Sequence, residues 1–257
     1  MSDLSELKIP SMRERVSREE WATRVDLAAC YRLVHHYGMD DLVYNHISAR
    51  VPGEEGHVLI NPYGMTYDEI TASSLVKIDF DGKVVQDSGS GYGINHAGFV
   101  IHSAVHRGRP DVACVIHTHT PAGMAVSAMK CGLLPLTQNA MFFSGVGYHD
   151  YEGPAVDLDE QQRLVADLGE HVAMVLRNHG LLAVGATIPE AFITLYWLER
   201  ACQAQVFAMQ TECQLPDKAT VVKTNQRYKP GQRRRIGELE WAGLLRLLER
   251  RYPGFRD

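Results

Sequence analysis

Residues 114–121 constrain the possible fold more than any other stretch of this sequence. They form a short apolar run followed by two histidines that are separated by one residue. If the run is a β-strand, its alternation points His117 and His119 to the same face, where both imidazoles can bind one metal ion. Thr120 and Pro121 are typical of the cap and the first position of a helix, so a helix should follow the strand without a loop between them. We therefore expect a strand whose end carries a metal-binding pair.

A third histidine, His179, follows a second apolar segment and precedes Gly180. Segments 172–176 and 181–184 are predicted strands, and the turn between them would use the backbone freedom of Gly180. Three neutral imidazoles bind zinc or other divalent first-row metals and leave coordination positions open for water or substrate. The alternative is three ordinary histidines, because a lone His-x-His pair carries little weight. The strand end before the pair and the second His-Gly turn favour the metal site.

The bulk composition limits the classes of partner. A chain of 257 residues with 45% apolar residues is long enough for one sizeable core. A formal net charge of −5 gives no strong attraction to nucleic acid or to an acidic membrane, so we expect a small-molecule partner. Five cysteines without Cys-x-x-Cys spacing indicate reduced thiols in a cytoplasm. A polar N-terminus excludes a signal peptide, and no run approaches the roughly 18 apolar residues of a membrane span.

Helix and strand signals alternate along the chain, which predicts an α/β fold with a central, largely antiparallel sheet. Residues 1–16 are expected to form an N-terminal arm and residues 17–257 a single domain, with a C-terminal helical tail from about residue 215. Segment 41–51 is predicted to be a strand that bends around Asn45 and His46. Further strands are predicted at 58–60, 76–80, 83–86, 114–119 and 145–149. Helices are predicted after Ser17, after Thr120, and at about 97–107, 159–169, 187–211 and 239–248.

Two other stretches are interpreted without a function. The glycine-rich segment 88–93 matches no phosphate-binding loop and is expected to be a connection. The basic cluster at 233–235 is more typical of a solvated or subunit-contacting surface than of a nucleic-acid site in a net negative chain.

Five motifs together resemble the class II aldolase/adducin family, and they occur in family order over about residues 20 to 210. They are Asn45-His46-Ile47-Ser48-Ala49-Arg50, Asn61-Pro62-Tyr63-Gly64, His102 with Arg109-Pro110-Asp111-Val112, His117-Thr118-His119-Thr120, and Asn178-His179-Gly180. The resemblance implies a three-layer α/β/α sandwich and a ring-shaped homotetramer with active sites at subunit boundaries. It also implies a divalent-metal site, usually zinc, with His117, His119 and His179 as ligands.

Two departures separate the chain from the sugar-phosphate aldolases of that family. The resemblance places their acid/base glutamate four residues before His102, where this chain has Gly98 after His96-Ala97 in place of two serines. The Gly-Asn pair that helps those aldolases to hold phosphate is Asn45-His46 here. Both changes weaken the sugar-phosphate interpretation and favour an unphosphorylated acid or an aromatic compound. The pattern 95–99 is similar to the adducin-like branch, which contains uncharacterised bacterial proteins and is similar to some non-haem iron oxygenases.

A proton carrier must replace the missing glutamate, and the candidates lie in motif loops that the family places near the metal. Histidine suits this task because its unperturbed pKa lies near neutrality. The candidate proton carriers are His46, His96 and Tyr92. Each could instead serve only as a helix cap or a loop hydrogen bond. His102 is a further catalytic candidate beside the site, or else a buried, hydrogen-bonded histidine. The candidate substrate-binding residues are Asn45, Ser48 and Asn95.

Three hypotheses for the function follow. The leading one is a metal-dependent lyase of aldolase or decarboxylase type acting on a small oxo or hydroxy acid, because a metal that stabilises an enolate serves retro-aldol cleavage, decarboxylation and epimerisation alike. Zn²⁺ is the expected ion, with Fe²⁺ or Mn²⁺ as alternatives. The second hypothesis is a non-haem Fe(II) oxygenase on the same fold. The third is a non-catalytic, adducin-like assembly module.

Overall fold

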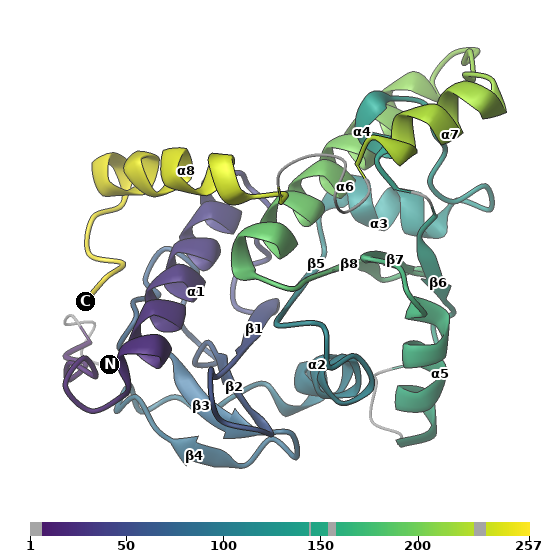
Figure 1. Cartoon of the computed structure of the whole chain (residues 1–257). Coiled ribbons are helices and arrows are strands. Elements are labelled where there is room, and N and C mark those ends of the chain that lie inside the picture. The colour runs from purple at the N-terminus through teal and green to yellow at the C-terminus, as the bar shows by residue number, and fades with distance from the viewer. Residues whose placement is uncertain (1–6, 144, 154–157, 229–234) are drawn as a thin grey trace, which may run out of the picture.

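An eight-stranded sheet runs through the computed structural model, which describes residues 7–143, 145–153, 158–228 and 235–257 (Figure 1). The strand order is β4-β3-β2-β1-β5-β8-β7-β6, and every neighbouring pair is antiparallel except β6 with β7. The strands are β1 (His46–Arg50), β2 (His57–Ile60), β3 (Val76–Asp79), β4 (Val84–Gln86), β5 (Cys114–Thr118), β6 (Gly147–His149), β7 (Ala173–Leu176) and β8 (Gly180–Gly185). The predicted α/β fold with a mostly antiparallel sheet is confirmed.

Helices cover both faces of this sheet and make it the middle of three layers (Figure 1). They are α1 (Arg18–His36), α2 (His96–Gly108), α3 (Pro121–Ala128), α4 (Gln138–Met141), α5 (Leu158–Leu168), α6 (Ile188–Ala208), α7 (Lys218–Gln226) and α8 (Glu238–Arg251). One face packs against α1, α3, α6 and α8, and the other packs against α2 and α5. Among the helices of the described ranges, none combines the length and the apolar character that crossing a membrane requires.

Alternation along β5 decides which side of the sheet carries the two histidines of the opening motif. Cys114 and Ile116 belong to the core under α1 and α6, whereas Val115 belongs to the core under α2 and α5. His117 therefore faces the α2 side. Because β1 pairs with β5 so that His46 lies opposite His117, strand β1 brings a further histidine next to this position.

Caps predicted from the sequence form as expected at three helix starts. The Ser17 hydroxyl accepts a hydrogen bond from the Glu20 amide at 3.1 Å and begins α1. The Thr120 hydroxyl accepts from the Gly123 amide at 3.1 Å, with Pro121 at the first helical position of α3. Thr187 caps α6, which at 21 residues is the longest helix of the described ranges. Each cap satisfies an amide that the first helical turn leaves without a partner.

The predicted strand over 41–51 begins later than expected. Residues 42–44 form a turn in which Leu42 has a φ of 49° and the Tyr44 amide donates to the Asp41 carbonyl at 2.9 Å. Leu42 and Tyr44 contributed to the prediction of a strand here, but they are 67% and 51% exposed and belong to the loop. The loop before β1 instead carries Asp41 and Tyr44 toward the histidines.

The first and the last described segments of the chain pack on the body of the protein. Met12 is fully buried and its amide donates to the Ser73 hydroxyl at 3.1 Å, so the described part of the N-terminal arm is in contact with the sheet layer. In the tail, the Trp241 indole donates to the Asp26 carboxylate at 2.9 Å and joins α8 to α1. The tail expected from about residue 215 contains helix α7 as well as α8. Of the predicted basic cluster, Arg233 and Arg234 lie outside the described residues, and Arg235 is exposed.

We expect Met12→Ala to lower the free energy of unfolding by about 2–5 kcal/mol, because the truncation opens a cavity beneath the arm. Met209→Ala is the matched control, since Met209 is 43% exposed and its truncation should cost less than about 0.5 kcal/mol. Urea denaturation of both variants measures the difference. If Met12→Ala lowered the free energy of unfolding as little as Met209→Ala, the Met12 side chain would contribute no packing to the fold.

Candidate metal centre

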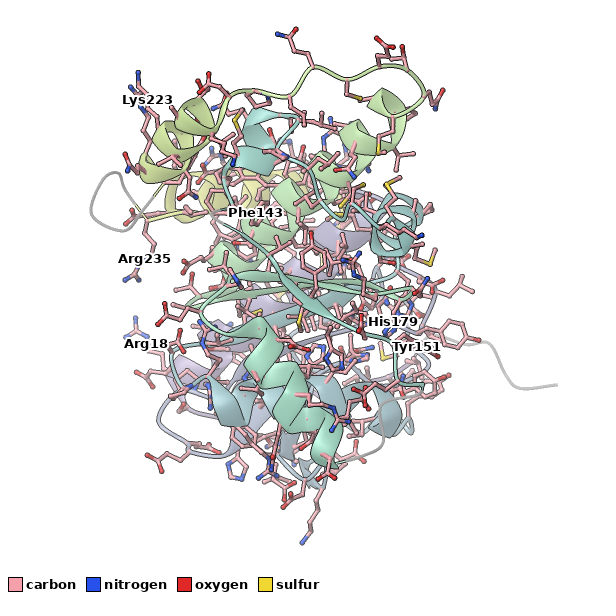
Figure 2. All side chains as sticks on the ribbon, turned by 90° about the vertical axis from the view of Figure 1, so that its right-hand side faces the viewer. Arg18, Phe143, Tyr151, His179, Lys223 and Arg235 are labelled. Atoms are coloured by element: carbon pink, nitrogen blue, oxygen red, sulfur yellow. The ribbon has the colours of Figure 1, made fainter. Side chains whose placement is uncertain are left out.

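Three histidine side chains meet at one point beside the end of β5. His117 lies in β5, His119 directly follows it, and His179 lies in the turn that joins β7 to β8. The Nε2 atom of His119 is 2.8 Å from Nε2 of His117 and 3.0 Å from Nε2 of His179. One nitrogen from each ring lies within 4.8 Å of the others, so the three residues form a group that can hold a metal ion. In Figure 2 the labelled His179 lies beside Tyr151, whose ring reaches outward.

Hydrogen bonds on the far side of two rings determine which nitrogen carries the proton. Nδ1 of His117 lies 2.9 Å from the Leu181 carbonyl oxygen, and Nδ1 of His119 lies 3.1 Å from a carboxylate oxygen of Asp41. Both oxygens accept hydrogen bonds, so each Nδ1 is the N–H donor, and in a neutral ring Nε2 then carries a lone pair. Two lone pairs 2.8 Å apart cannot hydrogen-bond to one another. A shared cation removes this repulsion, and an N–H donated to a carbonyl or carboxylate is the usual outer contact of a metal-bound histidine.

The surroundings of His117 and His179 favour the neutral form of these two imidazoles. Burial lowers the pKa of His117 well below its ordinary value, and burial together with His119 lowers the pKa of His179 to about 4. Neutral imidazoles are the form that binds a metal. Tetrahedral bonds of about 2.0–2.1 Å would separate two ligand nitrogens by about 3.3 Å, and the two nitrogen pairs that include His119 are 2.8 and 3.0 Å apart. The donor set therefore fits a small divalent ion.

The turn that carries His179 depends on two neighbouring residues. Asn178 has a φ of 54°, in the left-handed region that asparagine tolerates better than most residues. Gly180 was expected to supply such angles, and this expectation was wrong. A Cβ at Gly180 would instead lie 2.3 Å from the Thr118 carbonyl oxygen, so glycine is needed because β8 packs closely on β5. This close packing places His179 against His119.

The histidines line a cavity of about 510 Å³. Its polar lining includes Asp41, His46, Asn95 and Asn178. Its apolar and aromatic lining includes Tyr44, Ile101, Met124 and Tyr151. The sequence did not single out Asp41, Tyr44, Met124 or Tyr151, because they lie outside the recognised motifs. The one available signal was the acidic and aromatic composition of segment 41–44 immediately before the first motif.

His46 is the candidate proton carrier that the structure brings to this cavity. It begins β1, and its ring centroid lies 6.2 Å from that of His117. The side chain is 2% exposed, and neither ring nitrogen has a hydrogen-bond partner among the described residues. A buried polar group without a partner is costly, which indicates that a ligand or a water completes its hydrogen bonding.

Gly98 explains how the His46 ring fits there. A Cβ at position 98 would lie 2.0 Å from Cε1 of His46 and 2.6 Å from its Nε2. The imidazole therefore occupies the space where any side chain at position 98 would begin, and a glutamate at 98 is incompatible with His46 in this position. Burial lowers the pKa of His46 to about 4, close to the ordinary value of about 4.3 for a glutamate carboxyl.

A hydrogen-bonded pair of histidines lies behind His46. His102 is fully buried, and its ring centroid is 4.5 Å from that of His46. The Ser48 hydroxyl oxygen is 2.7 Å from Nδ1 of His102 and 2.8 Å from Nε2 of His106, so the hydroxyl donates to one ring and accepts from the other. Ser48 is fully buried in this bridge rather than at the cavity, unlike the substrate-binding role expected for it. His106, which the motifs left without a role, completes the bridge.

The other candidates take different places. Tyr92 packs its ring on Gly64, where a Cβ would lie 2.7 Å from Cδ1 of the tyrosine, and it is not in the described lining of the cavity. Asn95 does line the cavity, and its side chain also caps α2 by accepting from the Gly98 amide at 3.3 Å. Asn45 is buried behind the described lining with both amide atoms unpartnered.

The remaining candidate, His96, is the first residue of α2, and its side chain lies outside the described residues.

Comparison with known proteins links this geometry to a family. Residues 25–206 match the profile described as the Class II Aldolase and Adducin N-terminal domain. The crystal structure of an aldolase II superfamily protein from Pseudomonas syringae is 48% identical with a TM-score of 0.91, covering 96% of this chain and 100% of that one. An L-fuculose 1-phosphate aldolase from Glaciozyma antarctica PI12 is 28% identical with a TM-score of 0.80, covering 95% and 94%. Alpha-adducin of Mus musculus is 41% identical over 91% of this chain and 35% of its own length.

We expect His179→Ala to weaken zinc binding by more than about 100-fold, because it removes a ligand. Asp41→Ala should weaken binding by about 10–100-fold, because it removes only the outer contact of His119. His57→Ala is the matched control, since His57 pairs with Glu54 away from the cavity. Competition with a zinc-chelating dye measures all three. An unchanged affinity in His179→Ala would exclude this residue as a ligand.

Gly98→Ala should lower the free energy of unfolding by about 1–3 kcal/mol, because the added methyl collides with the buried His46 ring. Gly243→Ala, within α8 and with no atom nearer than 3.8 Å to its new Cβ, should raise it by about 0.5–1 kcal/mol. Chemical denaturation compares the two. Stabilisation by both substitutions would mean that His46 does not occupy the space beside position 98.

Proposed function

Because this chain belongs to the class II aldolase and adducin family, we propose that it is a divalent-metal-dependent lyase acting on a small oxo or hydroxy acid. Family membership and the likeness to an L-fuculose 1-phosphate aldolase support an aldolase-type function in general. The observation that carries the proposal is the pair of Nε2 lone pairs of His117 and His119, 2.8 Å apart at the cavity wall. A divalent cation is the partner that such a pair requires.

In this proposal His117, His119 and His179 hold the ion, with Zn²⁺ as the expected metal and Fe²⁺ or Mn²⁺ as alternatives. When bound, the ion supplies Lewis-acid polarisation of the substrate oxygens. Asp41 and the Leu181 carbonyl fix the tautomers of His119 and His117, so both ligand nitrogens are presented without a proton. The hydrogen bonds to Asp41 and to the Leu181 carbonyl also orient the two rings before a metal ion binds.

His46 is the proposed acid/base. Its ring lines the cavity, stands where a side chain at position 98 would lie, and has both nitrogens free of partners among the described residues. In a retro-aldol cleavage it would take the proton of the substrate hydroxyl while the carbon–carbon bond breaks, and would return a proton to the enolate carbon. His102 would act as a positioning residue, because it packs behind His46 and is itself held by Ser48.

The further organisation of the protein is part of the same proposal. Residues 1–16 would form an N-terminal arm and residues 17–257 one domain, which includes a helical tail from about residue 215. We propose a cytoplasmic homotetramer with active sites near subunit boundaries, supported by the family resemblance. The substrate is a small molecule, and neither nucleic acid nor a membrane is a proposed partner.

A second candidate is an adducin-like assembly module without catalysis. The observation in its favour is that alpha-adducin shares 41% identity with this chain, whereas the L-fuculose 1-phosphate aldolase shares 28%. An assembly role gives no physical reason for two ring nitrogens 2.8 Å apart at a cavity wall, or for a buried imidazole whose nitrogens have no well-aligned partner among the described residues. These two features favour the lyase.

Zinc-loaded protein should release pyruvate from 4-hydroxy-2-oxo acids. His117→Ala should abolish both zinc binding and turnover, whereas His46→Ala should retain zinc and lose about 10²–10⁴-fold in kcat, because it removes only the proton carrier. The measurement couples pyruvate release to lactate dehydrogenase, with zinc content determined on the same samples. His57→Ala is the control and should turn over like the parent protein.

The same preparations separate the alternatives. Iron in place of zinc in protein purified without added metal, together with oxygen uptake on 2-oxo acids, would favour the Fe(II) oxygenase. A cellular phenotype that survives in His117→Ala, with an intact oligomer and no turnover by the parent protein, would favour the assembly module.

A further inference from the structure

The cavity beside the three histidines offers little positive charge to a substrate. Its described lining contains neither lysine nor arginine, and its carboxylate is that of Asp41. Arg177, in the same turn as His179, directs its guanidinium to the Met129 carbonyl at 2.8 Å and over the Tyr148 ring at 4.3 Å. Its charge is therefore engaged with other groups. A phosphate dianion in this cavity would meet no lysine or arginine among the described lining residues.

A helix start is the other common phosphate-binding feature, and here it is occupied. Helix α2 begins at the cavity, but the Asn95 side chain accepts from the Gly98 amide at 3.3 Å. The Asn95 carbonyl accepts from the Phe99 amide at 3.0 Å. The His46 ring lies directly against Gly98. The Gly98 and Phe99 amides in the first turn of α2 therefore already have acceptors, and the His46 ring covers Gly98.

Large apolar and aromatic groups gather at the cavity from three separate segments. Tyr44 comes from the loop before β1, Met124 from α3 and Tyr151 from the segment after β6. They are 51%, 43% and 56% exposed. The Tyr151 ring centroid is 6.0 Å from that of His179, so this aromatic surface begins beside the candidate metal ligands (Figure 2). Exposed aromatic and thioether groups that converge on a concave site are typical of a surface that binds an apolar ligand group.

From this distribution we infer that the substrate is an unphosphorylated 2-oxo or 2-hydroxy acid with an aromatic or bulky apolar group. The inference rests on the proposed lyase function and names its substrate class. The acid oxygens belong at the three histidines, and the apolar group belongs among Tyr44, Met124 and Tyr151. A cavity of about 510 Å³ has the size of sites that hold such molecules.

For a 4-aryl-4-hydroxy-2-oxo acid the chemistry balances without an oxidant or a further reactant. The bond between C3 and C4 breaks, and its electron pair stays on C3. The proton of the C4 hydroxyl moves to His46, so that C4 becomes the carbonyl carbon of an aryl aldehyde. A proton returned to C3 completes pyruvate.

Binding of two stable analogues tests the inference separately from turnover. The probes are 2-oxo-4-phenylbutanoate and 2-oxo-4-phosphonobutanoate, which differ only in the group at C4, titrated into zinc-loaded protein by calorimetry. We expect the phenyl compound to bind at least tenfold more tightly. Equal or tighter binding of the phosphonate would overturn the substrate class, whether or not the enzyme cleaves 4-hydroxy-2-oxo acids. Absence of pyruvate release from those acids would count against the lyase proposal instead.

A positive charge added at the mouth of the cavity provides a second, independent test. Met124→Lys should shift the ratio of the two affinities toward the phosphonate by at least tenfold, because it supplies the missing cation. Met209→Lys is the matched control, since both methionines are 43% exposed and Met209 lies outside the described lining. We expect the control to leave the ratio unchanged. If Met124→Lys and Met209→Lys had the same ratio of affinities for the two analogues, the placement of the C4 group beside Met124 would be overturned.

Discussion

The opposed lone pairs of His117 and His119 are the constraint on which the site depends. The Leu181 carbonyl and the Asp41 carboxylate each take an N–H from one ring, so the two remaining nitrogens face each other at 2.8 Å with no proton to share. Two strands, a turn and a loop meet to create this arrangement: β5 carries His117, β8 supplies Leu181, the turn before β8 adds His179, and the loop before β1 adds Asp41. The connection after β5 is short, because Thr120 already caps α3. His119 therefore stays close to His117.

An exchange of side chains next to this centre distinguishes the protein from the sugar-phosphate aldolases that its motifs resemble. Gly98 leaves room, and the His46 ring fills it to within 2.0 Å of the missing Cβ. The two positions lie far apart in the sequence but form one unit in space. A single change at position 46 replaces both a phosphate-holding residue and, in our proposal, the acid/base. In our proposal the loss of phosphate binding and the change of proton carrier have one structural cause, and the apolar mouth of the cavity agrees with it.

The sequence predicted the parts of this structure that local physics determines. Strand periodicity, the Ser17 and Thr120 caps and the alternation along β5 indicated an α/β fold with a largely antiparallel sheet. The family resemblance added the three layers and brought the three histidines into one hypothesis. Contacts between residues far apart in the sequence could not be predicted from it. The need for Gly180 comes from the Thr118 carbonyl, and the bridge from His102 through Ser48 to His106 joins β1 to α2. Tyr44 and Tyr151 lie in loops, where no periodicity indicates a direction.

X-ray absorption at the zinc K-edge of the zinc-loaded protein tests the central claim most directly. Our account predicts a first shell of three imidazole nitrogens at about 2.0–2.1 Å, the multiple-scattering pattern of histidine rings, and an additional light atom from water at an open position. Addition of a 2-oxo acid should change only the light-atom contribution. A shell containing sulfur, or one with fewer than three imidazoles, would contradict the assignment of His117, His119 and His179 as the metal ligands.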